Sequence, residues 1–173
     1  MSPVPGTPLS GHRAAAQRRL FLRFSIGADV YVLDTREVLQ VLPLAPCKQI
    51  PGMPPWVAGL AMHRGRALPV VDVTALATGR AAARLTSTRV AVVDSPAPGG
   101  GRAPLGLILE KATETAHYDP SAFLPSGLDH RDAPYLGPVL ETGGTLLQWL
   151  RVDELVPAAA RERLFGAARE AQE

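Results

Sequence analysis

The sequence predicts a mainly β protein made of two small antiparallel barrels around a shared core, with short helices and a C-terminal helix. First, 17 prolines and 16 glycines among 173 residues divide the chain into many short segments with frequent turns. Second, apolar residues alternate along several of these segments, as they do in half-buried strands. Third, hairpin patterns lie on both sides of a connector of small residues, 79–85, which separates two lobes.

The chain divides into three parts. Residues 1–18 are rich in Pro, Gly, Ser and Ala and lack a hydrophobic period, which predicts a disordered tail. Residues 19–156 contain the strand patterns and are expected to form one domain with two barrel subdomains. Residues 157–173 are expected to form a helix and a short tail.

The first hairpin follows directly after the tail. Leu20, Leu22, Phe24 and Ile26 alternate with other residues, which predicts a strand with these four side chains on one face. A tight turn after Gly27 leads into a partner strand over 30–33. Residues 34–42 also suit a helix face, but β-branched residues and Pro43 favour a short turn followed by a strand from about Glu37.

The most informative stretch runs from Pro51 to Val73. Pro51, Pro54 and Pro55 at its start withhold amide donors, so the segment cannot open as a central strand. Gly59 interrupts the next apolar run and marks a bulge or a close approach of another backbone. Residues 63–66 form a charged turn, and 68–71 form a short strand that ends before Asp72.

The second half of the chain also contains hairpin patterns. A brief helical turn over 73–77 ends at Gly79. The further predicted elements are strands over 88–94 and 104–110 as a second hairpin, an additional strand over 113–118, a third hairpin of 136–141 and 146–152 around Gly143 and Gly144, and a helix from after Pro157 to about Arg169 with Ala160, Leu164, Phe165 and Ala168 on its apolar face.

The charge distribution argues against a nucleic-acid-binding protein. The formal net charge is +2 with a pI near 9.0, but the first nineteen residues hold three arginines and no acid. The rest of the chain has 15 basic and 16 acidic residues, a net charge of −1. A nucleic-acid module would show a concentrated basic face with stacking aromatics, and neither pattern is present in the sequence.

No residue pattern indicates catalysis, a metal or a cofactor. The single cysteine, Cys47, has no evident activating partner, and no two of the four histidines are spaced as i, i+4 ligands. Asp72, Asp94 and Glu110 end or edge strands, where we expect solvated carboxylates. The chain also lacks an apolar run of transmembrane length and a secretory leader, which predicts a cytoplasmic protein with no direct membrane insertion.

The stretch from Pro51 to Asp72 resembles the signature of CheW-like coupling domains. That signature has a Pro-containing lead, a Val-x-Gly strand, an Arg-Gly turn and a Pro-Val-x-Asp strand, matched here by Pro51–Pro54, Val57 with Gly59, Arg64 with Gly65, and Pro69–Asp72. The resemblance extends over roughly residues 20 to 165. It departs at Met62 and His63, where the family usually has an Asn-Leu pair.

The resemblance implies a fold and a function. The fold would be two SH3-like barrels. The function would be that of a non-enzymatic adaptor that couples a methyl-accepting chemoreceptor to a CheA-type histidine kinase. Its partners would be the regulatory domain of the kinase and the cytoplasmic tip of the receptor, which would recruit the protein from the cytoplasm to membrane-associated receptor arrays. The alternatives are a general SH3-like interaction module unrelated to chemoreceptors and a single-stranded nucleic-acid-binding barrel.

The resemblance also implies a set of partner-binding residues. Gln40 stands where the family often has an acid, so its link to Arg64 would be a hydrogen bond with a neutral acceptor. Arg64 suits both direct partner contact and a structural role in the turn. Arg89 stands where the family commonly has an apolar residue. The full set is Val38, Gln40, Gly59, Arg64, Thr88, Arg89, Val90, Gly106 and Ala112.

A narrower resemblance concerns the coupling proteins of Wsp-type surface-sensing systems, whose output controls cyclic-di-GMP. It rests on the segment from Ala133 to Thr142, the ending from Leu146 to Pro157, and the absence of the Asn-Leu pair before Arg64.

Overall fold

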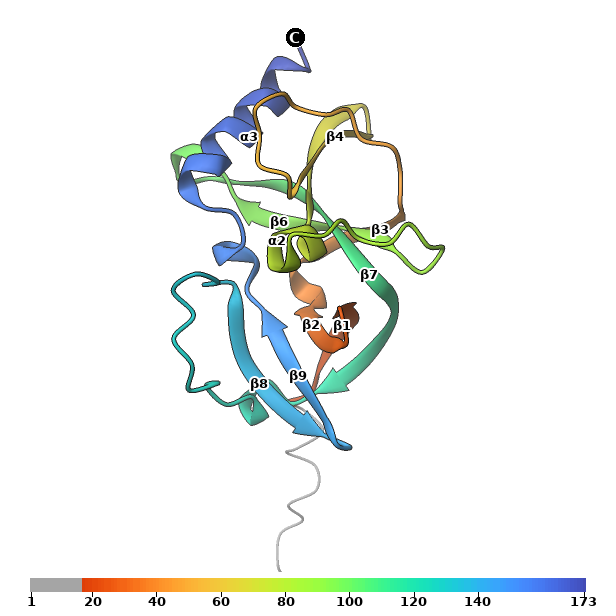
Figure 1. Ribbon diagram of the computed structural model, residues 1–173, viewed down its shortest axis with the longest axis vertical. Helices are drawn as coiled ribbons and strands as arrows, with labels where there is room; N and C mark the ends of the chain where they lie inside the picture. Colours follow the sequence, from red (N-terminus) through yellow and green to blue (C-terminus); the bar gives the residue numbers. More distant parts are fainter. Residues whose placement is uncertain (1–16) are drawn as a thin grey trace, which may run out of the picture.

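The computed structural model describes residues 17–173, so the predicted tail lies outside the described residues except for Gln17 and Arg18. Two β-barrels lie one above the other along the long axis, and the C-terminal helix lies at the end of the second barrel (Figure 1). The predicted architecture, a mainly β fold of two small barrels with a C-terminal helix, is confirmed.

The first barrel is formed by strands near the two ends of the chain together with the second half of the long strand β7 (Arg102–Tyr118). Two antiparallel hairpins contribute most of its pairing, β1 with β2 and β8 with β9. A parallel pairing between β2 and β9 joins the hairpins, a feature that the sequence prediction of purely antiparallel barrels did not include. The strands are β1 (Arg19–Ile26), β2 (Asp29–Asp34), β8 (Leu136–Thr142) and β9 (Thr145–Leu150).

The second barrel is formed by the middle of the chain and the first half of β7. Its strands lie in the order β3-β6-β7-β5-β4, and β5 pairs with β7 in parallel. A 3-10 turn, η1 (Thr35–Glu37), connects β2 of the first barrel to β3 of the second. The strands are β3 (Val38–Pro43), β4 (Val57–His63), β5 (Arg66–Asp72), β6 (Arg89–Pro96) and β7 (Arg102–Tyr118).

Strand β7 corrects the prediction of two separate strands over 104–110 and 113–118. It is one continuous strand of 17 residues that pairs with β5 and β6 in the second barrel and with β1 in the first. Lys111 has a positive φ of 51°, and the pairing with β1 shifts between Ser25↔Glu110 and Arg23↔Glu114. This bulge bends the strand from one barrel into the other (Figure 1).

Three apolar clusters account for the packing. The largest contains residues of both barrels, among them Phe24, Val71, Ala91 and Leu107, and therefore forms the predicted shared core. A second cluster, around Val70 and Val92, lies inside the second barrel, because alternate residues of its strands point away from the shared core. The third cluster fills the first barrel.

Aromatic side chains dominate that third cluster. Phe21 is fully buried there, and the centroid of its ring lies 5.5 Å from that of Phe123 and 4.9 Å from that of Trp149. Phe21 is therefore buried on the face of β1 opposite to Leu22, Phe24 and Ile26, whereas the sequence predicted only one apolar face. Leu20, which was assigned to that face, lies near the strand end and is 36% exposed.

Two helices complete the fold. Helix α2 (Val73–Thr78) ends at Gly79, whose φ is 76°, as predicted. Helix α3 (Ala158–Glu170) inserts Leu164 and Phe165 into the shared core. Pro157 is its N-cap, one position before the first-turn position that the sequence indicated.

Asp72 corrects another prediction. It is 8% exposed, not a solvated strand end, because its carboxylate accepts hydrogen bonds from the amides of Ala75 (3.0 Å) and Ala82 (2.9 Å). The first of these bonds caps α2, and the second fixes the connector that follows the helix.

Candidate partner-binding surface

Strand β3 presents an apolar outer face to solvent. Leu39 and Val41 are 57% and 42% exposed, and β3 lies at one end of the strand order of the second barrel. Val38, the contact residue suggested by the sequence, lies on the opposite face and packs against the shared core. Alternate residues of β3 point to opposite faces, but the sequence does not tell which face is exposed, because Val38, Leu39 and Val41 are all apolar.

The turn between β4 and β5 is held by two residues with positive φ, Arg64 at 51° and Gly65 at 73°. Two consecutive residues of this kind give the hairpin a primed turn, which matches the twist of the strands. The Arg64 guanidinium donates a hydrogen bond from Nη2 to Oε1 of Gln40, 3.3 Å away. The structure thus contains the bond with a neutral acceptor that the sequence predicted.

Five of the nine candidate residues are buried, and two of them are glycines at close approaches. Gly59 has a φ of 128°, and a Cβ there would collide with the Lys48 carbonyl, which pairs with Leu60 across a β-bridge. At Gly106, a Cβ would come within 3.1 Å of methyl groups of Val70 and Val90. Both glycines therefore allow the second barrel to pack.

The other three buried candidates are Thr88, Val90 and Ala112, which are 1%, 4% and 2% exposed. The Thr88 hydroxyl donates to the Ala83 carbonyl over 2.5 Å and fixes the connector before β6. These three side chains offer no surface to a partner in this structure. Arg89, the ninth candidate, is half-buried, and its guanidinium donates to the Thr86 carbonyl.

A groove lies between the β4–β5 hairpin, strand β3, the loop that follows β6 and helix α3. Its volume is about 370 Å³, and most of its lining is apolar. Gln40 and Arg64 line it together, and Leu39 lies at its edge with 57% exposure. Of the candidate residues, the structure thus brings Gln40 and Arg64 together and adds Leu39, which sequence reasoning missed.

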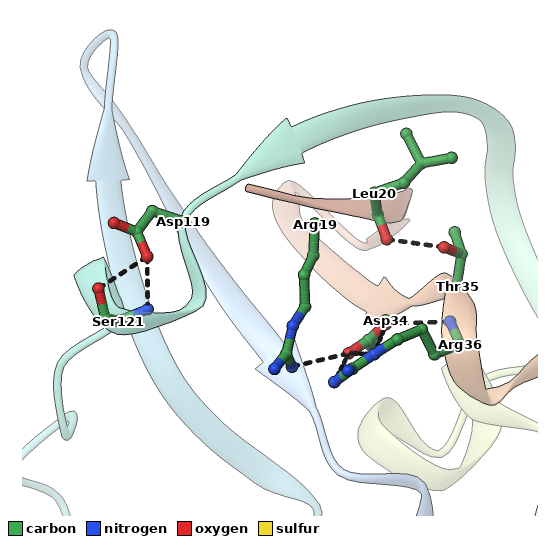
Figure 2. Close-up of polar contacts among 7 residues, drawn as sticks. All are labelled: Arg19, Leu20, Asp34, Thr35, Arg36, Asp119 and Ser121. Atoms are coloured by element: carbon green, nitrogen blue, oxygen red, sulfur yellow. Dashed lines mark hydrogen bonds and ion pairs between the residues drawn. The ribbon is translucent and has the colours of Figure 1, made fainter. Parts of the chain in front are cut away.

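A second and more polar cavity, of about 690 Å³, lies where η1 approaches the β8–β9 hairpin. One of its walls is organised by Asp34, which is 3% exposed and forms ion pairs with Arg36 (3.1 Å) and Arg19 (3.4 Å) (Figure 2). Figure 2 also shows the Thr35 hydroxyl donating to the Leu20 carbonyl over 2.8 Å. These contacts hold η1, and therefore the link between the barrels, in place.

Glu37, in the same turn, has an unusual environment. Its pKa is raised to about 7 by partial burial and by the neighbouring carboxylates of Asp34 and Asp153, which together outweigh the lowering effect of Arg102 and Arg36. Asp119, by contrast, accepts hydrogen bonds from the Ser121 hydroxyl (2.7 Å) and amide (2.9 Å), which lower its pKa (Figure 2). In the part of the chain that the structure describes, neither carboxylate belongs to a group of three or more side chains that could hold a metal ion.

Within residues 17–173, no group of three or more His, Cys, Asp or Glu side chains is placed to hold a metal ion. Burial raises the pKa of the Cys47 thiol, the opposite of what an activated nucleophile needs. None of the helices described in the structure is both long and apolar enough to cross a bilayer.

Comparison with known proteins agrees with this arrangement. A family model described as a CheW-like domain matches residues 20–160. No curated protein matches the sequence significantly. Among solved structures, the scaffolding protein TtCheW from Thermoanaerobacter tengcongensis is 20% identical, with a TM-score of 0.72 over 84% of this chain and 92% of that one. The family match spans most of the chain and the structural match shows the same fold, so the chain belongs to the CheW-like family, whose members are non-enzymatic adaptor domains.

Proposed function

We propose that this protein couples the cytoplasmic tip of a methyl-accepting chemoreceptor to the regulatory domain of a CheA-type histidine kinase. The observation that carries the proposal is the outer face of β3, where Leu39 and Val41 are exposed on a strand at the end of the barrel's strand order. Exposed apolar side chains on such a strand suit docking of another small barrel. The kinase regulatory domain would bind this face.

The receptor tip, a helical hairpin, would bind between the two barrels through its apolar side chains. Signalling would then require only that the receptor make different contacts in its two states. The difference in binding free energy between these states would shift the equilibrium of the kinase. The protein would act in the cytoplasm at receptor arrays. Its output would be that of a Wsp-type system controlling cyclic-di-GMP, an assignment supported by sequence resemblance alone.

The test is calorimetric titration of the protein with the regulatory domain of the CheA-type kinase from the same cell. Leu39→Asp and Val41→Asp are preferable to a Val38 substitution, because Val38 packs against the core and its replacement would disturb folding. Leu146→Asp, at a 61% exposed position on β9 of the first barrel, is the matched control. Circular dichroism establishes that each variant is folded.

Micromolar or tighter binding that is weakened at least tenfold by the β3 variants and unchanged by the control would support the proposal. Absence of binding to both the kinase domain and a receptor-tip fragment would overturn it and favour a general interaction module. Salt-dependent binding of a single-stranded oligonucleotide would favour the nucleic-acid alternative instead.

A further inference from the structure

The groove between α3 and the second barrel combines an apolar floor with positively charged sides. Leu68, Pro69, Phe165 and Ala168 are among its apolar residues, and Phe165 and Ala168 come from the helix. The side-chain amide of Gln172, two residues after the helix, donates to the Ala67 carbonyl of β5 over 3.4 Å beside the groove. Phe165 also packs into the shared core, so helix α3 forms one wall of the groove.

The charges that line the groove are all of one sign. Arg64 and Arg66 come from the hairpin and Arg169 from the helix, and no Asp or Glu is among the lining residues. Within the described part of the chain, none of these arginines forms an ion pair with a carboxylate. The chain beyond residue 19 has a net charge of −1, so this concentration of cations is local and not a property of the whole surface.

Two large apolar side chains in or beside the groove are exposed to solvent. Leu39 at its edge is 57% exposed, and Met62, next to the lining residue His63, is 74% exposed. A small anion would cover neither side chain, whereas a polypeptide segment is long enough to fill the groove and extend over them. A nucleic-acid strand would need stacking surfaces, but Phe165, the only Phe, Tyr or Trp lining the groove, is just 7% exposed.

We propose that this groove binds a short polypeptide segment in which large apolar side chains are flanked by Asp or Glu. The apolar side chains would fill the cavity, whose volume lies in the range of about 300–1,000 Å³ that is typical of binding pockets. The flanking carboxylates would pair with Arg66 and Arg169. This site goes beyond the coupling function, since it requires neither the receptor nor the kinase to be its partner.

The test uses the full chain and three fluorescein-labelled heptapeptides with Leu and Phe at the centre. The flanking residues are Asp and Glu in the first peptide, Asn and Gln in the second, and Lys in the third. Binding is followed by fluorescence anisotropy at low salt for the wild type and for a double variant, Arg66→Gln with Arg169→Gln. Arg80→Gln, an exposed arginine after α2 that does not line the groove, is the matched control.

The acidic peptide should bind the wild type most tightly, and the double variant should lose about threefold to tenfold in affinity, because two exposed ion pairs are removed. Amide NMR signals of Ala67, Ala168 and Gln172 should shift on addition of the peptide. Equal affinity for the three peptides, an unchanged affinity in the double variant, or shifts confined to the first barrel would each overturn the proposal.

The groove and the coupling surface share Leu39, and the double variant distinguishes them because it changes only the groove arginines. It should still bind the kinase regulatory domain, because neither substitution touches the outer face of β3. Failure of the peptide to bind would leave the coupling proposal intact, and failure of the kinase domain to bind would leave this one intact.

Discussion

Arg64 Nη2 lies 3.3 Å from Gln40 Oε1, and this hydrogen bond joins the β4–β5 turn to strand β3. Strands β3 and β4 are the two ends of the strand order in the second barrel. The bond therefore links two strands that share no backbone ladder. Since Gln40 and Arg64 also line the groove beside α3, it sets the position of the guanidinium there as well.

Replacing Gln40 with Glu should strengthen this link. A charged acceptor makes a stronger hydrogen bond with Arg64, but the pair is near the surface, so we expect a gain in unfolding free energy of about 0.2–1 kcal/mol. Urea denaturation of wild type, Gln40→Glu, Arg64→Asn and the double variant measures the coupling; Asn is chosen because it tolerates the positive φ of residue 64. An equal gain in the absence of the Arg64 guanidinium would contradict this account.

Asp72→Ala should be clearly destabilising. The buried carboxylate accepts two amide hydrogen bonds, from Ala75 and Ala82, and its removal leaves both donors without their partner. We expect a loss of about 1–3 kcal/mol in the free energy of unfolding, measured by chemical denaturation. The control is Asp129→Ala, whose carboxylate pairs with Arg131 at an exposed position and which should change stability by less than about 0.5 kcal/mol. Similar losses in the two variants would show that the Asp72 cap is unimportant.

Glu37 should make stability depend on pH. Its pKa is about 7 in the folded protein and 4.5 in the unfolded chain, so the folded state binds the proton more tightly. This contribution to stability is fully present below pH 4.5 and is lost as the pH rises through 7. Because the side chain is only half-buried, we expect the change to be on the order of 1 kcal/mol.

The comparison with Glu37→Gln isolates this effect, because all other groups titrate in both proteins. The two should be equally stable near pH 4.5, and the Gln variant should be the more stable at pH 8 in urea titrations. A stability difference that does not vary with pH would rule out the raised pKa.

Lys111 should tolerate Gly but not Val. Its φ of 51° is unfavourable for side chains and most unfavourable for β-branched ones. We expect Lys111→Val to lose about 1–2 kcal/mol of unfolding free energy and Lys111→Gly to lose none. Thermal and chemical denaturation of the two variants distinguish these cases, and a Val variant as stable as the wild type would mean that the bulge is not strained.

The sequence predicted the hairpins well because their signals are local. Alternating apolar residues and consecutive turn residues such as Gly143 and Gly144, with φ of 56° and 77°, act over a few positions. The sequence did not predict that β7 is one continuous strand, because nothing in it marks a lysine at positive φ. The burial of Asp72 was not predicted because its hydrogen-bond partner Ala82 is ten positions away.

The candidate site was harder to predict than the fold. The hydrogen bond between Gln40 and Arg64 was predicted correctly. Val38 was chosen as the contact residue although Leu39 is the exposed one, since a shift of one residue exchanges the two faces of a strand. Gly59, Thr88, Val90, Gly106 and Ala112 are buried, and only long-range packing of the second barrel reveals it. Family resemblance marked these positions without distinguishing structural residues from contact residues.

Strand β7 also determines how the protein unfolds. This one strand supplies a wall to each barrel and the two barrels share a core, so opening either barrel removes packing from the other. Amide protons of the two barrels should therefore exchange with solvent in a single cooperative unit and not as two independent ones. A partner that stabilises one barrel should, for the same reason, slow hydrogen exchange in the other, so that binding at one end of the protein is felt at the opposite end.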